Sequence, residues 1–260
     1  MASERIGLEV SDAVATITLQ RPDKRNAIDL DMLTALELAC DRIDGDAGIR
    51  AAVMAGAGKS FSAGGDIGAW GHMTPEAFGW SWIRRGNRVF DRLARLRVPL
   101  IAVLTGAVYG GGLELAACAD IRIAATDATI GLPETGLGII PGWSGTQRLV
   151  RRFGAQPIRR MVLGAEILPA EEALRLGLVD ALAPPDEALA AGRLHAARIA
   201  ARSPVATAIA KLMIAVGEGE DASGALDTLG GMLAAGTGDG RDGVEAFLDK
   251  RAPAFKGLWT

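Results

Sequence analysis

The sequence predicts an α/β fold in which strand–strand–helix units come first and helices close the chain. Short apolar runs of strand length alternate with amphipathic segments through the early part of the chain. From about Glu187 onward the pattern is predominantly helical. With 260 residues, 49% of them hydrophobic, the chain can bury a full-sized core, either as one large domain or as two smaller ones.

The first unit is predicted to be a strand hairpin followed by a helix. Ile6–Val10 and Val14–Leu19 have strand character, and the turn residues Ser11 and Asp12 join them. A helix is expected to begin near Asp29, because apolar side chains then recur at helical spacing. This apolar stripe consists of Leu33, Leu36, Cys40 and Ile43.

The same alternation continues through the middle of the chain. Further strands are expected at Ala51–Ala55, Leu100–Leu104 and Asp120–Ala125. Further helices are expected from the Thr74-Pro75-Glu76 start signal, near Gly112–Ala119, and over Leu168–Gly177, where glycine ends the helix.

Charge and cysteine content argue against several classes of protein. A formal net charge of −3 produces no field that would gather nucleic acid or an anionic membrane. Cys40 and Cys118 lie in apolar stretches, so we expect reduced core thiols and no disulfide framework. No signal peptide and no apolar run of membrane-spanning length are found, so a cytoplasmic protein is expected.

Familiar cofactor and hydrolase motifs are not matched. The segment Ala55–Ser60 imitates the end of a phosphate-binding P-loop, but Val53 stands where that motif needs glycine. No G-x-G-x-x-G follows a strand, and Gly142–Gly145 is off register for G-x-S-x-G. Two histidines and two scattered cysteines do not make a zinc site. We therefore expect neither a metal nor a separate cofactor.

One glycine turn and two acidic residues carry the clearest chemical signal. Gly110–Gly112 removes side chains from a turn, so that amide N–H groups can approach a ligand. Glu114 follows at the start of the predicted helix, and Glu134 follows 20 residues later. Bare amides beside two carboxylates can stabilise an oxyanion while protons are moved next to it.

A second glycine-rich loop, Lys59–Ile67, extends this pattern, and the two loops together resemble the enoyl-CoA hydratase/isomerase family, the crotonase superfamily. The resemblance covers nearly the whole chain. Its other motifs are Arg21–Ile28, Val98–Val103, Gly106–Ala116, Gly131–Gly142, Gly145–Leu149, Leu168–Ala173 and Ala246–Arg251.

The resemblance implies a crotonase (ClpP-like) spiral of ββα units. It places the spiral core with its acyl-CoA site in residues 1–195 and a helical C-terminal trimerisation region in residues 196–260. It also implies a homo-oligomer, either a trimer or a hexamer built as a dimer of trimers.

The resemblance further implies roles for individual residues. The N–H groups of Gly65 and Gly111 would form an oxyanion hole for the thioester carbonyl of an acyl-CoA. Glu114 would accept the proton of a water molecule that adds to Cβ, and Glu134 would supply a proton to Cα. The residues expected to contact CoA or the acyl group are Arg25, Ala27, Ala63, Asp66, Ile67 and Trp143.

The chain departs from the family's pattern near the second glutamate. The family often reads Pro-Gly-x-Gly-Gly-Thr, whereas this chain reads Pro-Gly-Trp-Ser-Gly-Thr over residues 141–146. Trp143 either narrows the acyl pocket or packs under the loop, and the sequence leaves both readings open. The Trp70–Trp82 segment matches the family's most variable part, so the acyl group is not predicted.

Two glutamates at matching positions favour an enoyl-CoA hydratase, which reversibly adds water to a 2-trans-enoyl-CoA to give a 3-hydroxyacyl-CoA. One alternative is another acyl-CoA reaction on the same scaffold, such as double-bond isomerisation or a specialised dehydration. A second alternative is a non-catalytic CoA-binding or RNA-binding relative. The acidic charge balance argues against RNA, and the presence of both glutamates argues against a silent pocket.

Overall fold

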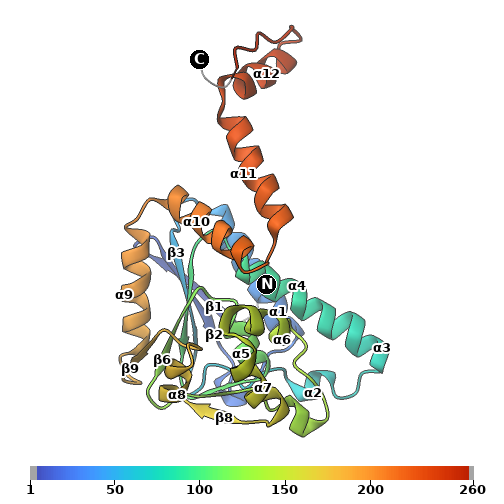
Figure 1. Ribbon diagram of the computed structural model, residues 1–260, viewed down its shortest axis with the longest axis vertical. Helices are drawn as coiled ribbons and strands as arrows, with labels where there is room; N and C mark the ends of the chain where they lie inside the picture. The colour runs from blue at the N-terminus through green and yellow to red at the C-terminus, as the bar shows by residue number, and fades with distance from the viewer. Residues whose placement is uncertain (1–4, 258–260) are drawn as a thin grey trace. The chain divides into compact units, whose positions relative to one another are not determined.

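The computed structural model describes residues 5–257 and divides the chain into two compact units (Figure 1). The first unit ends at Ala208 and the second begins at Ile209. The boundary expected between residues 195 and 196 falls inside helix α9 (Ala188–Ala200), which belongs to the first unit.

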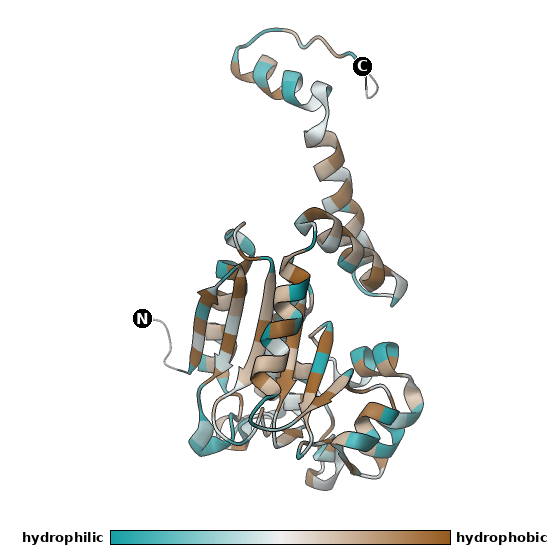
Figure 2. Cartoon of the chain, turned by 90° about the vertical axis from the view of Figure 1, so that its left-hand side faces the viewer, coloured by the Kyte–Doolittle hydropathy of each residue, from teal (hydrophilic) through white to brown (hydrophobic). Residues whose placement is uncertain are grey.

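A six-stranded sheet forms the centre of the first unit, in the order β1-β2-β3-β4-β6-β9. Its first pair is antiparallel and every later pair is parallel. Mostly apolar residues run along its central strands (Figure 2), as expected for strands buried on both faces. The strands are β1 (Ile6–Ser11), β2 (Val14–Leu19), β3 (Ala51–Gly56), β4 (Leu100–Leu104), β6 (Ile121–Ala125) and β9 (Ala181–Ala183).

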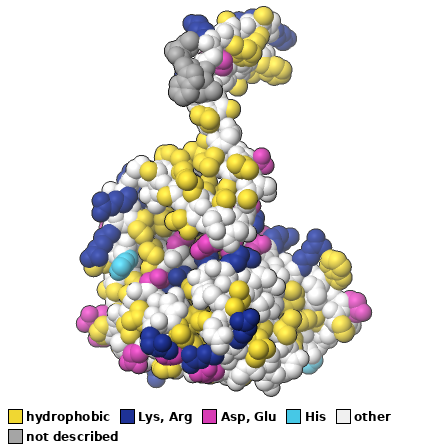
Figure 3. Space-filling model, viewed as in Figure 1, with side chains coloured by type: hydrophobic (Ala, Val, Ile, Leu, Met, Phe, Trp, Pro, Cys, Tyr) yellow, Lys and Arg dark blue, Asp and Glu magenta, His cyan; other side chains and the backbone are white. Residues whose placement is uncertain are grey.

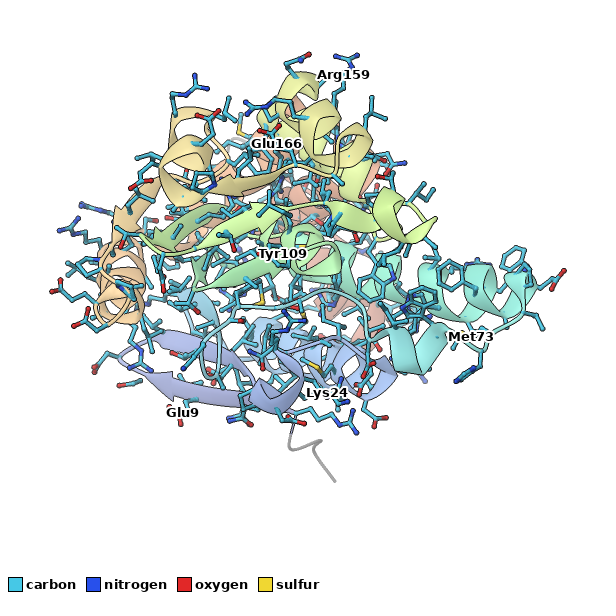
Figure 4. The ribbon with its side chains drawn as sticks, turned by 90° about the horizontal axis from the view of Figure 1, so that it is seen from below. Glu9, Lys24, Met73, Tyr109, Arg159 and Glu166 are labelled. Atoms are coloured by element: carbon cyan, nitrogen blue, oxygen red, sulfur yellow. The ribbon has the colours of Figure 1, made fainter. Side chains whose placement is uncertain are left out.

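A second sheet holds three short strands, β5 (Ala107–Tyr109), β7 (Thr129–Gly131) and β8 (Ile167–Pro169). The prediction of a helix from Leu168 was wrong at its start, because Leu168 pairs with Ile130 of β7 and the helix begins only at Ala170. Long-range strand pairing therefore overrides the local helical pattern at this point. Seen from below, Tyr109 of β5 lies near the middle of the first unit (Figure 4).

Helices cover both faces of the six-stranded sheet. On one face α9 packs against β3 and β4, where Val53 and Val103 form part of a buried cluster. On the other face lie α1 (Leu30–Gly45) and α4 (Arg84–Ala94), which share a larger core containing Phe61 and Phe90. The expected start of α1 is confirmed, because the Asp29 side chain accepts a hydrogen bond from the N–H of Met32 at 2.9 Å.

The remaining helical elements of the first unit are short. They are η1 (Pro22–Lys24), α2 (Ile67–Trp70), α3 (Pro75–Ala77), η2 (Phe78–Ile83), α5 (Gly111–Ala116), η3 (Pro133–Leu137), α6 (Gly145–Phe153), α7 (Ala155–Leu163) and α8 (Ala170–Arg175).

The second unit is helical, as the sequence predicted. Its elements are the end of α10 (Pro204–Gly217), then α11 (Ala222–Gly236) and α12 (Gly238–Leu248). Large apolar side chains are exposed on it (Figure 3); they include Met213, Ile214, Leu226, Leu233, Phe247 and Leu248. Among the described helices none is by itself long and apolar enough to cross a membrane, and only α9 and α10 taken together pass that test.

Candidate active site

The two glycine-rich loops lie against each other. Ser62, in the loop that follows β3, pairs with Val108 of β5, and its carbonyl oxygen accepts a hydrogen bond from the N–H of Tyr109 at 3.0 Å. The same loop pairs through Gly65 with Ile28, which comes from the early turn. Three segments that are far apart in the sequence therefore meet at one place.

Gly64 allows this close approach. Its φ is +98°, and a Cβ on it would lie 2.8 Å from the carbonyl oxygen of Tyr109 and 3.1 Å from the nitrogen of Gly111. Only glycine fits both the backbone angle and the space. As a result, the nitrogen of Gly65 lies 3.2 Å from the position that a Cβ on Gly111 would occupy.

The two predicted oxyanion-hole residues are therefore brought together. Within residues 5–257 neither the Gly65 nor the Gly111 N–H donates a hydrogen bond to the protein. Gly111 is the first residue of α5, where the N–H has no partner within the helix. Two adjacent free donors can hold one oxygen atom that gains negative charge.

Glu114 projects from α5 and is 3% exposed. Its Oε1 atom accepts hydrogen bonds from the N–H groups of Trp143, at 2.6 Å, and Gly145, at 2.8 Å. Burial, and then the charge of Glu134, raise the pKa of Glu114 to about 8, although the backbone N–H groups oppose this shift. Glu114 is thus a buried carboxyl held in one orientation.

Glu134 lies in η3, directly after β7, and is 8% exposed. Its Oε2 atom is buried and has no hydrogen-bond partner among the described residues. A Cβ on Gly110 would lie 2.8 Å from Oε1 of Glu134, so the second glutamate sits directly against the glycine turn. Burial raises the pKa of Glu134 to about 7.

One cavity contains both glutamates and both free N–H groups, and it encloses about 570 Å³ of empty space including its opening to solvent. Of the predicted contact residues, Ala63, Ile67 and Trp143 line it, whereas Arg25, Ala27 and Asp66 do not. The rest of its lining is mostly apolar and comes from Trp70, Phe78, Trp82, Ile83, Pro133, Leu137, Ile139 and Ile140. An apolar cavity with a few convergent polar groups is typical of a small-molecule site.

Arg25, Ala27 and Asp66 lie in the neighbouring turn and are tied to the cavity loop. The carbonyl oxygen of Arg25 accepts a hydrogen bond from the N–H of Ala63 at 2.9 Å. Arg21, the first residue of the Arg21–Ile28 motif, donates to the carbonyl oxygen of Ala27 at 2.5 Å and to Oδ2 of Asp66 at 2.8 Å. Although partial burial opposes ionisation, the hydrogen bond and charge of Arg21 keep the pKa of Asp66 below its usual value.

Asn87 is a residue that the sequence analysis missed. From α4 its Nδ2 atom donates to the carbonyl oxygen of Gly142 at 3.1 Å, and its Oδ1 atom accepts from the Ser144 hydroxyl at 2.8 Å. Ser144 has a φ of 63°, an unusual value for a residue with a side chain. Asn87 thus holds the residues before and after Trp143, and the N–H of Trp143 in turn donates a hydrogen bond to Glu114. No local motif marks Asn87, because its partners lie more than 50 residues later.

Trp143 packs under the loop and also lines the cavity. Its side chain is 2% exposed and packs under the loop against Trp82 and Phe90, with ring centroids 5.1 Å apart in each pair. The same ring lines the cavity beside Glu114.

Comparison with known proteins identifies the family. The sequence profile described as "Enoyl-CoA hydratase/isomerase" matches residues 9–258, so the chain belongs to this family. A short-chain-enoyl-CoA hydratase of Clostridium acetobutylicum is 37% identical over 96% of this chain and 97% of its own length. A crotonyl-CoA hydratase of Syntrophomonas wolfei is 36% identical over 98% of this chain and 99% of its own length.

Solved structures agree with the family's crotonase fold. The crystal structure of an enoyl-CoA hydratase from Bacillus anthracis matches with a TM-score of 0.81 and 32% identity, over 98% of this chain and all of that one. The Pseudomonas aeruginosa protein DspI matches with a TM-score of 0.82 and 34% identity, over 98% of both chains. The α/β spiral that the sequence predicted is thereby confirmed.

Proposed function

We propose that this protein is an enoyl-CoA hydratase that reversibly adds water to a 2-trans-enoyl-CoA and forms a 3-hydroxyacyl-CoA. The observation that carries the proposal is the pair of buried carboxyls, Glu114 and Glu134, in one cavity with two free N–H groups. Relatives named as hydratases of short-chain enoyl-CoA and crotonyl-CoA support the same reaction.

In this proposal the thioester oxygen lies between the N–H groups of Gly65 and Gly111. As hydroxide adds to Cβ, negative charge develops on that oxygen, and the two donors stabilise it. Glu114 accepts the proton that the water loses, while Glu134 gives a proton to Cα. The reverse reaction uses the same groups with their roles exchanged.

A proton shared between the two carboxyls suits acid–base catalysis by this pair. Since two buried carboxyls in one cavity repel each other when both are charged, they titrate as a pair and hold one proton near neutral pH. The two N–H groups bonded to Glu114 stabilise its carboxylate, whereas Oε2 of Glu134 is buried without a partner. These hydrogen bonds favour the base at Glu114 and the proton at Glu134. The higher pKa of Glu114, about 8 against about 7 for Glu134, favours the reverse, so the proposed division of labour rests on the hydrogen bonds and not on the order of the pKa values.

The remaining predicted residues have roles in binding. Ala63, Ile67 and Trp143 contact the acyl end of the substrate, and Arg25, Ala27 and Asp66 belong to the surface that receives the CoA moiety. The reaction requires no metal and no cofactor beyond the CoA of the substrate, because the thioester itself acidifies Cα.

We further propose that the protein acts in fatty acid metabolism in the cytoplasm, as a homo-oligomer with neither nucleic acid nor membrane as a partner. The exposed apolar side chains of the second unit are suited to contacts between subunits of a trimer or hexamer.

The test is the absorbance of the conjugated thioester of crotonyl-CoA. We expect added enzyme to remove this band reversibly, with 3-hydroxybutyryl-CoA as the product. Persistence of the band, together with turnover of a 3-enoyl-CoA, would show that the chain is an isomerase instead.

A further inference from the structure

The indole of Trp143 lies against the two glycines that present the free N–H groups. A Cβ on Gly111 would lie 2.8 Å from Cζ3 and 2.9 Å from Cε3 of the indole, and a Cβ on Gly65 would lie 3.5 Å from Cη2. The ring therefore fills the space next to the two N–H groups that would hold the thioester oxygen in the proposed reaction. An acyl chain that continues inward from that position meets this ring.

The ring is fixed from behind. Its Nε1 atom donates to the carbonyl oxygen of Trp82 at 3.3 Å, and the rings of Trp82 and Phe90 pack against it. Gly86 of α4 makes room for the indole, because any Cβ at this position would overlap the ring. The contacts with Trp82, Phe90 and Gly86 therefore hold the ring in one position at the cavity wall.

The cavity differs between its two ends. At the mouth, the apolar residues Ile67, Leu137 and Ile140 are 52%, 61% and 72% exposed. At the inner end, Trp82 and Trp143 are 3% and 2% exposed. The inner end is thus a closed aromatic wall directly beside the reacting groups.

We propose that Trp143 is a specificity-determining residue that ends the acyl pocket shortly beyond Cβ, so that the substrates are short-chain 2-enoyl-CoAs. This inference rests on the proposed hydratase function for the place of the thioester. A longer chain would have to displace a packed aromatic ring. Overpacking of a well-filled core carries a free-energy cost equivalent to roughly tenfold or more in an equilibrium constant.

The first test measures binding, which does not depend on turnover. Calorimetry with butyryl-CoA and octanoyl-CoA should show that the wild-type protein binds octanoyl-CoA at least about tenfold more weakly. Trp143→Ala should remove this difference by opening the inner end, and Trp143→Leu should reduce it if the alanine variant does not fold. Trp80→Ala is the matched control, since Trp80 is 68% exposed and does not line the cavity.

Equal binding of both ligands by the wild-type protein would overturn the proposal, because it would mean that long chains leave through the mouth. An unchanged ratio in folded Trp143 variants would overturn it too. Turnover of crotonyl-CoA and 2-octenoyl-CoA then separates the two proposals. If the binding ratio shifts as expected but neither enoyl-CoA is hydrated, the pocket assignment stands and the hydratase assignment fails.

Discussion

The pKa values of two pairs of glutamates in this protein are shifted in opposite directions. Glu166 and Glu172, near the surface, accept hydrogen bonds from the Arg160 guanidinium at 2.6 Å and 2.8 Å, and these bonds lower the pKa of Glu166. Hydrogen bonds from Arg175 and then Arg160 likewise lower the pKa of Glu172. These carboxylates stay charged and form ion pairs with arginine side chains.

Glu114 and Glu134 are the same residue type in the opposite environment. Burial raises the pKa of both, to about 8 and about 7, and backbone N–H groups, not cations, contact Glu114. Of these four glutamates, only Glu114 and Glu134 have pKa values that allow proton exchange near neutral pH.

The largest effect is expected from removing the ionisable groups. Glu114→Gln and Glu134→Gln should each lower kcat by about 10²–10⁴-fold, the usual contribution of a positioned acid or base. Affinity for a saturated acyl-CoA should change little. Glu166→Gln is the control and should retain wild-type turnover. Turnover is measured by the loss of the crotonyl-CoA absorbance band. Wild-type turnover in either active-site variant would refute the assigned role.

Gly64→Ala should have the next largest effect. The new Cβ would press on the nitrogen of Gly111 and separate the two N–H groups, so kcat should fall by about 10²–10³-fold, as for a lost oxyanion-hole donor. The control is Gly177→Ala, because Gly177 also has a positive φ, of +73°, but has no atoms within 4 Å of the added Cβ. Equal losses in both variants would attribute the effect to backbone strain and not to the donors.

The pH dependence of kcat/KM reports the pair directly. Activity requires one ionised and one protonated carboxyl, so it should be greatest between about pH 7 and 8 and fall on both sides. Acid protonates the base, and alkali removes the proton that Cα needs. A profile that is flat from pH 5 to 9 would contradict the raised pKa values.

Loss of the Asn87 hydrogen bonds should have a smaller effect. Asn87→Ala frees the loop that presents the Trp143 N–H to Glu114, and we expect roughly tenfold lower kcat with a displaced acid limb of the pH profile. A merely structural role would lower stability without moving that limb. Arg88→Ala, a substitution at a 64% exposed side chain on the same helix, should change neither property.

The smallest effect concerns stability. Since the folded-state pKa of Glu134 lies above its unfolded value, the folded protein binds more protons, and stability falls as pH rises from about 4.5 through about 7. Glu134→Gln should therefore raise the Tm at pH 8 by a few degrees and make it less dependent on pH. A lower Tm in this variant at pH 8 would contradict burial as the cause of the raised pKa.

The fold could be predicted from the sequence wherever one local pattern decides it. Val14–Leu19 and Leu100–Leu104 are strands with the predicted bounds, and Asp29 caps the predicted helix. The three-residue strands β5, β7 and β8 could not be predicted, because pairing with distant segments forms them.

The candidate site follows the same division. Two glycine-rich loops and two glutamates stand out locally, and the structure brings Gly65, Gly111, Glu114 and Glu134 into one cavity. Asn87 did not stand out, because its contacts are made only in the folded chain. Trp143 was predicted as a contact residue, but its fit against Gly86 of α4 could not be predicted, because the two residues meet only in the folded chain.

The most direct test is a ¹³C NMR titration of glutamate side-chain carboxyls in the wild-type protein and in Glu114→Gln and Glu134→Gln. We predict two wild-type resonances that titrate together between about pH 6 and 9, one of which disappears in each variant while the other shifts towards lower pH. If every glutamate carboxyl of the wild-type protein titrates below pH 5.5, the cavity holds no shared proton and the proposed mechanism is wrong.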